Sequence, residues 1–309
     1  MISVVIITKD SAKRLGRCLE LLTDAPEVVV ADTGSSDDTP QIAKSFGAKV
    51  CHIPWTQDFA EARTRAQQHA RYELVMRLDD DELLRSPQGF SEVLALARST
   101  PDGICMKRTQ PSGESDMLLR VYSRKAWCWH YPVHEVLRSK FGQRLRVVDT
   151  NASWIEHRPS MRTRNYADMM LPHMGRYSDD PYMSYMHLKE LLQEQRWAEA
   201  LQAFRRYNNT TGGYHWHRSQ ADIFHGEILR EIGKPTEALA VLTDPALAST
   251  RAEALHLAVE IAVDLGMNPL AVDNLRQKAR ALRMPLETGM SGNPQVPYVI
   301  DRTKYVDPA

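Results

Sequence analysis

The stretch LVMRLDDDE, residues 74–82, decides the fold, because an apolar run ends there in four consecutive acids. An apolar run of this length, bounded by polar residues, is typical of a strand buried inside a sheet. Two acids that lie two residues apart on extended chain point to the same side, which places Asp79 and Asp81 on a shared face. Adjacent carboxylates repel one another, so we expect a cation or solvent to compensate their charge.

Upstream of this stretch, apolar strands alternate with helical patterns. Strands are expected at 3–8, 27–31, 49–53 and 74–78, and helices at 13–22, 39–46 and 58–69. This alternation predicts an α/β domain with a mostly parallel, doubly wound sheet. The looser pattern at 101–160 predicts the second half of the same domain, with antiparallel strands.

Polar clusters follow three of the expected strands, at 8–10, 32–38 and 79–82. In parallel α/β sheets, ligands bind beyond the carboxyl ends of the strands. We therefore expect the three clusters to converge on one site, although they are far apart in the sequence.

The C-terminal half has a helical, repetitive pattern. Similar segments occur at 195–204 (QRWAEALQAF), 233–242 (GKPTEALAVL) and 266–275 (GMNPLAVDNL), and they begin 38 and 33 residues apart. Paired helices at such a period are typical of tetratricopeptide-like solenoids. The expected organisation is a catalytic α/β domain at 1–165, tetratricopeptide-like helical repeats at 166–283 and a C-terminal tail at 284–309.

The composition excludes several classes of protein. The 39 basic and 39 acidic side chains balance, which gives nucleic acid no long-range attraction. The four cysteines are dispersed, so neither a zinc knuckle nor a disulfide framework is indicated. The apolar run at the N-terminus is far shorter than a membrane span and lacks the features of a signal peptide. We expect a soluble, cytoplasmic protein.

The acidic cluster at 79–82 has two possible interpretations. Hard divalent cations such as Mn²⁺ and Mg²⁺ bind carboxylate oxygens and commonly bridge to a diphosphate. In that reading one of Asp79 and Asp81 meets a ribose and the other a metal. The alternative is a solvated loop or a cap for a following helix.

Four ordered motifs resemble the first half of family-2 glycosyltransferases of the GT-A fold. They are VVIITKDSAKRLGRCLELL, VVVADTGSSDDTPQIAKSFGAKV, WTQDFAEARTRAQQHA and LVMRLDDDELL. The resemblance is dense over 1–85 and thinner to about 160. The most similar subgroup carries C-terminal tetratricopeptide repeats and includes SunS-like peptide glycosyltransferases and relatives of lipopolysaccharide-core glucosyltransferases.

The resemblance implies a donor site and a metal site. Thr8 would line the pocket of the nucleotide base, Asp32 would hold the base and Arg63 would reach the nucleotide. In the DxD motif, Asp81 would bind the metal. The expected donor-binding residues are Thr8, Asp32, Arg63, Asp79, Asp80 and Arg120. The family more often has Asn where this chain has Thr64.

Two histidine motifs lie in the second half of the domain. His134 and Glu135 in YPVHEVLR resemble the family's HE element. His157 in WIEHRPS resembles a histidine that completes the metal site in related enzymes. The subgroup usually continues with Gly-Tyr, whereas Arg158 and Pro159 follow here.

Sugar transfer with inversion requires a general base and compensation of the charge on the leaving diphosphate. We predict Glu135 as the base, because a carboxylate near other acids binds a proton more tightly. Asp116 is the second candidate, and Arg120 is expected to contact the diphosphate. For His134, a catalytic role competes with that of a core histidine bonded to backbone.

Other functions remain open from the sequence. The chain could be a helical-repeat scaffold with a vestigial α/β domain, whereas a nucleotidyltransferase would need a glycine-rich loop that TKDSAKRL lacks. The expected acceptor is a protein, a peptide or a saccharide. The segment GGYHWHR at 212–218 could stack nucleic-acid bases, or it could be a loop with buried aromatic side chains. The repeats could also form a homodimer.

Overall fold

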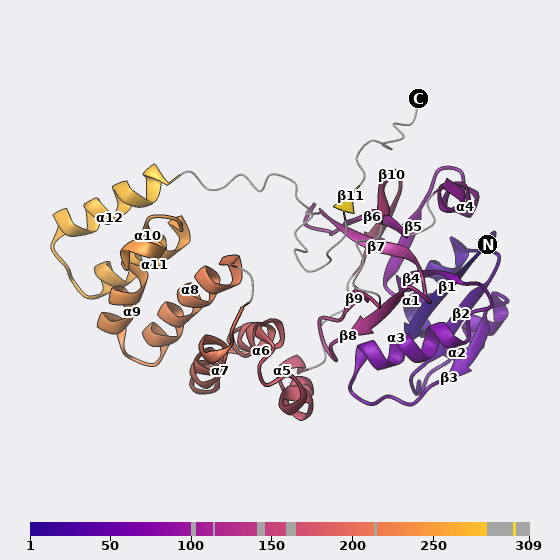
Figure 1. The fold of residues 1–309 in the computed structure, drawn as a ribbon, viewed down its shortest axis with the longest axis horizontal. Helices are drawn as coiled ribbons and strands as arrows, with labels where there is room; N and C mark the ends of the chain where they lie inside the picture. Colours follow the sequence, from indigo (N-terminus) through magenta and orange to yellow (C-terminus); the bar gives the residue numbers. More distant parts are fainter. Residues whose placement is uncertain are drawn as a thin grey trace. The chain divides into compact units, whose positions relative to one another are not determined.

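The structure is a computed structural model that describes residues 1–99, 103–113, 115–140, 146–158, 165–212, 215–282 and 299–300. These residues divide into two units (Figure 1). The first unit contains the described residues up to 158 together with 299–300, and the second contains 165–282. The expected tail at 284–309 lies outside the described residues, apart from the strand at 299–300.

A nine-stranded sheet forms the centre of the first unit (Figure 1). Its strands follow the order β11-β10-β6-β7-β4-β1-β2-β3, and β5 pairs with β10 beside this path. β1 runs parallel to β2 and β4, whereas β7 runs antiparallel to β4 and β6. The predicted α/β fold is therefore confirmed. The strands are β1 (Ile2–Thr8), β2 (Val28–Asp32), β3 (Lys49–His52), β4 (Leu74–Asp79), β5 (Glu82–Arg85), β6 (Gly103–Thr109), β7 (Ser115–Ser123), β10 (Arg146–His157) and β11 (Val299–Ile300).

Each face of the sheet has its own hydrophobic core. Alternate residues of β1 point to opposite faces, so Val4 and Ile6 join one core and Val5 joins the other. The first core also contains side chains of α1 (Ala12–Glu20), α2 (Thr39–Ser45) and α4 (Phe90–Ser99). The second contains side chains of α3 (Phe59–Gln68) and of the hairpin formed by β8 (Trp127–His130) and β9 (Val136–Ser139). The second face therefore carries both α3 and the loop that holds Glu135.

The second unit is entirely helical among its described residues. Its helices pack as consecutive pairs, α6 with α7, α8 with α9 and α11 with α12. Its elements are α5 (Tyr166–Met170), η1 (Leu171–Tyr177), α6 (Pro181–Gln193), α7 (Trp197–Asn209), α8 (His215–Glu231), α9 (Pro235–Leu242), α10 (Pro245–Ala248), α11 (Ala252–Asp264) and α12 (Pro269–Ala281). This pairing confirms the predicted helical-repeat region.

The sequence repeat is visible in the turns of the helical pairs. Gln195, Gly233 and Gly266 have φ angles of 56°, 80° and 64°, and each lies in the turn before the second helix of a pair. These residues begin the three repeated sequence segments. A left-handed φ favours glycine, which two of the three turns use. Among the described helices, none combines the length and apolar character that crossing a membrane requires.

Candidate active site

The carboxyl ends of β1, β2 and β4 lie side by side. Thr8 is the Cα partner of Asp32, and Ile7 is the Cα partner of Asp79. The N–H of Thr33 donates to the carbonyl of Thr8 over 2.9 Å, which ties the loop after β2 to the end of β1. The three polar clusters of the sequence thus meet at one place.

Asp80 points to the face of the sheet that α1 covers. Its carboxylate accepts hydrogen bonds from Thr8 Oγ1 at 2.6 Å, from Arg14 Nε at 3.0 Å and from Ser11 Oγ. Thr8 is 4% exposed. Both Thr8 and Asp80 therefore have protein partners where the sequence suggested nucleotide contacts, and their donor-binding roles stay predictions.

Arg63 joins two carboxylates that lie far apart in the sequence. Its Nη2 donates to Asp79 Oδ1 and its Nε to Glu135 Oε1, each over 2.7 Å. The other oxygen of Asp79 accepts from Arg77 Nη2 at 3.3 Å. The guanidinium carbons of Arg63 and Arg77 lie 5.2 and 5.3 Å from the ring centre of Trp129, within the range of cation–π attraction. The predicted site residues Asp79 and Glu135 therefore belong to one network.

Charge pairing keeps this network ionised. Burial alone would raise the pKa of Asp79, but the guanidinium groups of Arg63, Arg77 and Arg120 lower that pKa well below its usual value. Burial lowers the pKa of Arg63, but the nearby Asp79 and Glu135 carboxylates raise it by more. Two of the three guanidinium nitrogens of Arg63 donate to carboxylates here, so its predicted contact with the nucleotide stays a prediction.

The loop that carries Glu135 has an unusual backbone. Tyr131 and His134 have φ angles of 74° and 54°, a region that residues with side chains rarely adopt. The N–H of Phe59, at the start of α3, donates to the carbonyl of Pro132 over 2.8 Å. The loop is thus anchored to the helix that bears Arg63, and the Glu135 side chain is 12% exposed. His134 is half-buried, and its catalytic role stays a prediction.

His157 lies beside Asp81 because β5 and β10 pair directly after the acidic turn. His157 is the Cα partner of Glu82, and its Nε2 is 3.6 Å from Asp81 Oδ2. Its Nδ1 lies 2.6 Å from Gln110 Oε1. Since an amide oxygen only accepts, Nδ1 donates to Gln110, and Nε2 is the ring nitrogen that faces Asp81.

Asp81 and His157 fit a divalent cation that is shared with a diphosphate. Both side chains are about one-fifth exposed, at 20% and 19%. A histidine that binds a metal commonly donates its other N–H to a polar partner, as His157 does to Gln110. Within the described residues, no group of three or more His, Cys, Asp or Glu side chains could hold a metal. Two protein ligands suffice where phosphate and water oxygens supply the rest, as is usual for Mg²⁺.

Arg120 is enclosed within the sheet domain. Its side chain is 0% exposed and forms a two-pronged ion pair with Glu82. Arg120 Nη1 and Nη2 donate to the two carboxylate oxygens over 2.7 and 2.6 Å. Both Nη atoms of this guanidinium are thus bound to Glu82, and the expected contact of Arg120 with the diphosphate stays a prediction.

Asp32 has the contacts of a turn residue. Its carboxylate accepts from the N–H of Ser35 at 3.1 Å and from Ser35 Oγ at 2.5 Å, and it lies 3.1 Å from His52 Nδ1. Asp32 is 2% exposed. Bonds of an Asp side chain to the residue three positions on are typical of a turn, and the role of Asp32 toward a nucleotide base stays a prediction.

Asp116, the second candidate for the base, pairs with Arg108. The two bonds measure 3.0 and 2.6 Å, and the Asp116 side chain is 35% exposed. Asp116 and Glu135 are thus held by different arginines. The sequence did not suggest Arg77, Gln110 or Trp129 as site residues. The sequence does single out Arg77, since it is a charged residue inside an otherwise apolar strand.

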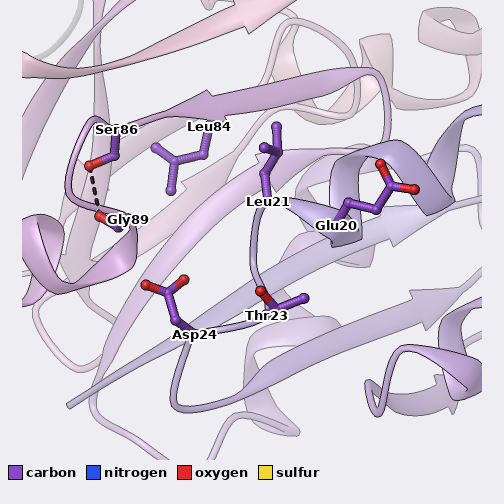
Figure 2. A pocket seen from close by; sticks show the side chains of 7 residues that line it. All are labelled: Glu20, Leu21, Thr23, Asp24, Leu84, Ser86 and Gly89. Carbon is purple, nitrogen blue, oxygen red and sulfur yellow. Dashed lines mark hydrogen bonds between the residues drawn. The ribbon is translucent and has the colours of Figure 1, made fainter.

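A pocket of about 300 Å³ lies elsewhere in the first unit (Figure 2). Its walls support the start of α4: Asp24 Oδ2 accepts from the N–H of Phe90 over 2.7 Å, and Ser86 Oγ donates to the carbonyl of Gly89 over 2.7 Å. Gly89 has φ +69°, and an added Cβ would lie 2.5 Å from Asp24 Oδ2. None of the predicted site residues lines this pocket. Its lining residues are Glu20, Leu21, Thr23, Asp24, Leu84, Ser86 and Gly89.

A sheet with a parallel core and an acidic turn at its carboxyl edge is the arrangement expected of the GT-A fold. The family model described as Glycosyl transferase family 2 matches residues 3–161, which are 159 of the 309 residues. The chain belongs to this family. The predicted family is therefore confirmed.

Similar proteins match a shorter stretch of the chain. A TPR repeat-containing protein of Synechococcus elongatus is 43% identical over 84 residues, which are 27% of this chain and 21% of that protein. An uncharacterized glycosyltransferase of Rickettsia typhi is 37% identical over 84 residues, which are 27% of this chain and 28% of that protein. The alignments thus span less than a third of either relative.

Solved structures match the chain at low similarity. TarS 1-349 of S. aureus in complex with UDP has a TM-score of 0.44 at 14% identity, covering 87% of this chain and 92% of that chain. Glucosyl-3-phosphoglycerate synthase of Mycobacterium tuberculosis, in complex with Mn²⁺, UDP and glucosyl-3-phosphoglycerate, has a TM-score of 0.29 at 23% identity. It covers 36% of this chain and 43% of that chain.

Proposed function

We propose that the chain is an active, metal-dependent, inverting glycosyltransferase that uses a nucleotide-sugar donor, with a UDP-sugar as the donor class. Membership of the family supports the reaction class. The observation that carries metal dependence is the pair formed by Asp81 and His157. Both side chains are partly exposed at the carboxyl edge of the sheet, and Gln110 fixes the ring of His157.

In this proposal, Asp81 and His157 would hold Mn²⁺ or Mg²⁺. The cation would offset the negative charge that develops on the departing nucleoside diphosphate. Glu135 would accept the proton of the acceptor as the bond between the anomeric carbon and the phosphate oxygen breaks and the bond to the acceptor forms on the opposite face. Arg63 orients Glu135 through the 2.7 Å bond to Oε1.

The acceptor in this proposal is a protein, a peptide or a saccharide. Nucleic acid is the weaker candidate, because His217 of the aromatic segment is 4% exposed and stacks on Tyr185 with ring centres 4.2 Å apart. A histidine in that position cannot stack on a base. Residues 213–214 of the segment lie outside the described residues. Formation of a homodimer through the repeats stays a prediction.

The proposed base is tested by release of UDP from UDP-glucose, UDP-galactose and UDP-N-acetylglucosamine with Mn²⁺, using water as the acceptor. Glu135→Gln should lower the rate by about 10²–10⁴-fold, the usual contribution of a general base, without weakening UDP binding. Asp116→Asn is the matched comparison and should retain the rate of the wild type. If Asp116→Asn loses activity while Glu135→Gln keeps it, the two roles are exchanged.

The competing function is a helical-repeat scaffold with an inactive α/β domain. Such a protein would neither bind UDP with Mn²⁺ nor release UDP from any of the three donors. The retained Asp79, Asp81 and Glu135, together with the ion pairs that hold Asp79 and Glu135, favour the enzyme.

A further inference from the structure

Glu82 and Arg120 form an ion pair in which both side chains are 0% exposed. Glu82 begins β5, directly after the three aspartates, and Arg120 lies on β7. The two guanidinium Nη atoms donate to the two carboxylate oxygens over 2.7 and 2.6 Å, a geometry that fixes both side chains in position. The acidic turn is thus joined to a strand that lies elsewhere in the sheet.

The same carboxylate also holds the backbone of the acidic turn. Glu82 Oε2 accepts from the N–H of Asp79 over 3.1 Å. Glu82 is the Cα partner of His157, and the carbonyl of Asp81 accepts from the N–H of Arg158 over 2.8 Å. Glu82 therefore binds the backbone ahead of Asp81 and lies in register with His157.

Stability alone gives little reason for this pair. A buried ion pair loses its hydration, and replacing such a pair by apolar side chains of similar size is often neutral or stabilising. Arg120 Nε is moreover buried without a hydrogen-bond partner in the structure, which adds a further cost. The pair does provide a fixed geometry around the turn that bears Asp79 and Asp81.

We propose that Glu82 and Arg120 are positioning residues that set the backbone of the acidic turn and thereby the separation of Asp81 and His157. This inference rests on the proposed function, in which Asp81 and His157 hold the cation. Neither Glu82 nor Arg120 touches the substrates; both act through their neighbours. The N–H of Asp79 and the register of β5 with β10 connect them to the site.

The test replaces both charges at once, so that no buried charge is left unpaired. The double variant Glu82→Leu/Arg120→Met should unfold in urea at nearly the same midpoint as the wild type. Its affinity for Mn²⁺ in the presence of UDP should fall about 10–100-fold, as is typical when support of metal ligands is lost. The imidazole ¹⁵N shifts of His157, measured by NMR in the metal-free protein, should also move.

Two further variants separate positioning from simple packing. Glu82→Gln/Arg120→Met keeps an oxygen that can accept from the N–H of Asp79, and it should recover most of the Mn²⁺ affinity. Arg85→Met/Glu156→Leu removes a pair on β5 and β10 whose side chains are 31% and 30% exposed. This control should leave both the affinity and the His157 shifts unchanged.

The outcomes distinguish the inference from the proposed function. A Glu82→Leu/Arg120→Met protein that folds stably with unchanged Mn²⁺ affinity and unchanged His157 shifts would overturn the inference. If wild-type protein does not bind UDP with Mn²⁺, the proposed function fails, and the His157 shifts of the metal-free variants still decide whether the pair positions the turn. Should the double variant fail to fold, the Glu82→Gln/Arg120→Met variant provides the same comparison.

Discussion

Two sets of buried side chains, one in each unit of the chain, differ in how their polar atoms are satisfied. In the first unit Arg63 pairs with Asp79, and Glu82 pairs with Arg120. In the helical unit His187 is buried, and neither of its ring nitrogens has a hydrogen-bond partner in the structure. His217 is also buried, and it stacks on Tyr185.

This difference follows from the free-energy cost of burying each kind of side chain. An unpaired charge is too costly to bury, and the charges of Arg63 and Glu82 are each paired at the strand ends. A neutral histidine costs less and can fill space between helices. Burial, followed by the charges of Arg206 and Arg196, lowers the pKa of His187 to about 4. Burial likewise lowers the pKa of His217 to about 4.

The largest expected loss of stability comes from breaking the paired network of the first unit. Arg63→Met leaves Asp79 and Glu135 without their shared partner, and it should lower the free energy of unfolding by about 3–5 kcal/mol. Urea denaturation measures this change. Arg65→Ala is the control on the same helix: its pair with Glu61 is exposed, at 40% and 37%, so the loss should be below about 1 kcal/mol. Equal losses of unfolding free energy would contradict the idea that the buried pairs of Arg63 stabilise the fold more than an exposed pair does.

Acid should destabilise the helical unit before the first unit. The folded pKa of His187 lies below the ordinary 6.5, so the unfolded state binds more protons between about pH 6.5 and 4. The stability contributed by neutral His187 is complete above about pH 6.5 and is lost as the pH falls toward 4, at a full cost of about 3 kcal/mol. Asp79, with its lowered pKa, stays charged in the folded state over this range.

Hydrogen exchange measured by mass spectrometry in urea at pH 7 and pH 5 reports the stability of each unit separately. His187→Leu should reduce the pH dependence of the helical unit, because the ring nitrogens have no hydrogen-bond partner to lose in the structure. His256→Gln replaces an exposed histidine of α11 and should leave the pH dependence as it is. A helical unit equally stable at both pH values would contradict the assignment.

The smallest expected loss of stability comes from removing a helix cap, and it should be similar in both units. Asp58 caps α3 by accepting from the N–H of Glu61 at 2.8 Å, and Asp180 caps α6 by accepting from the N–H of Met183 at 3.0 Å. Asp58→Ala and Asp180→Ala should each lower the free energy of unfolding by about 1 kcal/mol. Urea denaturation checks both variants. Similar losses of unfolding free energy would show that helix caps contribute alike in the two units, so that the units differ only in their buried polar groups.

Much of the fold could be predicted from the sequence because local patterns determine it. The run at 74–78 became β4 (Leu74–Asp79), and the repeated segments at 195, 233 and 266 begin in the turns before α7, α9 and α12. Apolar periodicity and turn residues act over short stretches of chain, so they are readable without a structure. The convergence of the polar clusters followed from the strand order alone.

The partners of charged residues could not be predicted in the same way. Arg120 and Glu82 are 38 residues apart and meet only because β7 and β5 belong to the same sheet. This pairing gives Arg120 a protein partner that the sequence did not predict, and its expected contact with the diphosphate stays a prediction. Gln110 has no sequence signal that links it to His157, and Arg63 is connected to Glu135 only through the packing of α3 against β8.

The central claim is that Asp81 and His157 hold a cation that a nucleoside diphosphate shares. Calorimetric titration with UDP, GDP and dTDP, each with and without Mn²⁺, tests it most directly on the wild type and on Asp81→Asn. The account predicts that the wild type binds UDP in a metal-dependent manner and that Asp81→Asn loses this dependence while remaining folded. Binding of none of the three nucleotides, or unchanged Mn²⁺ dependence in Asp81→Asn, would contradict it.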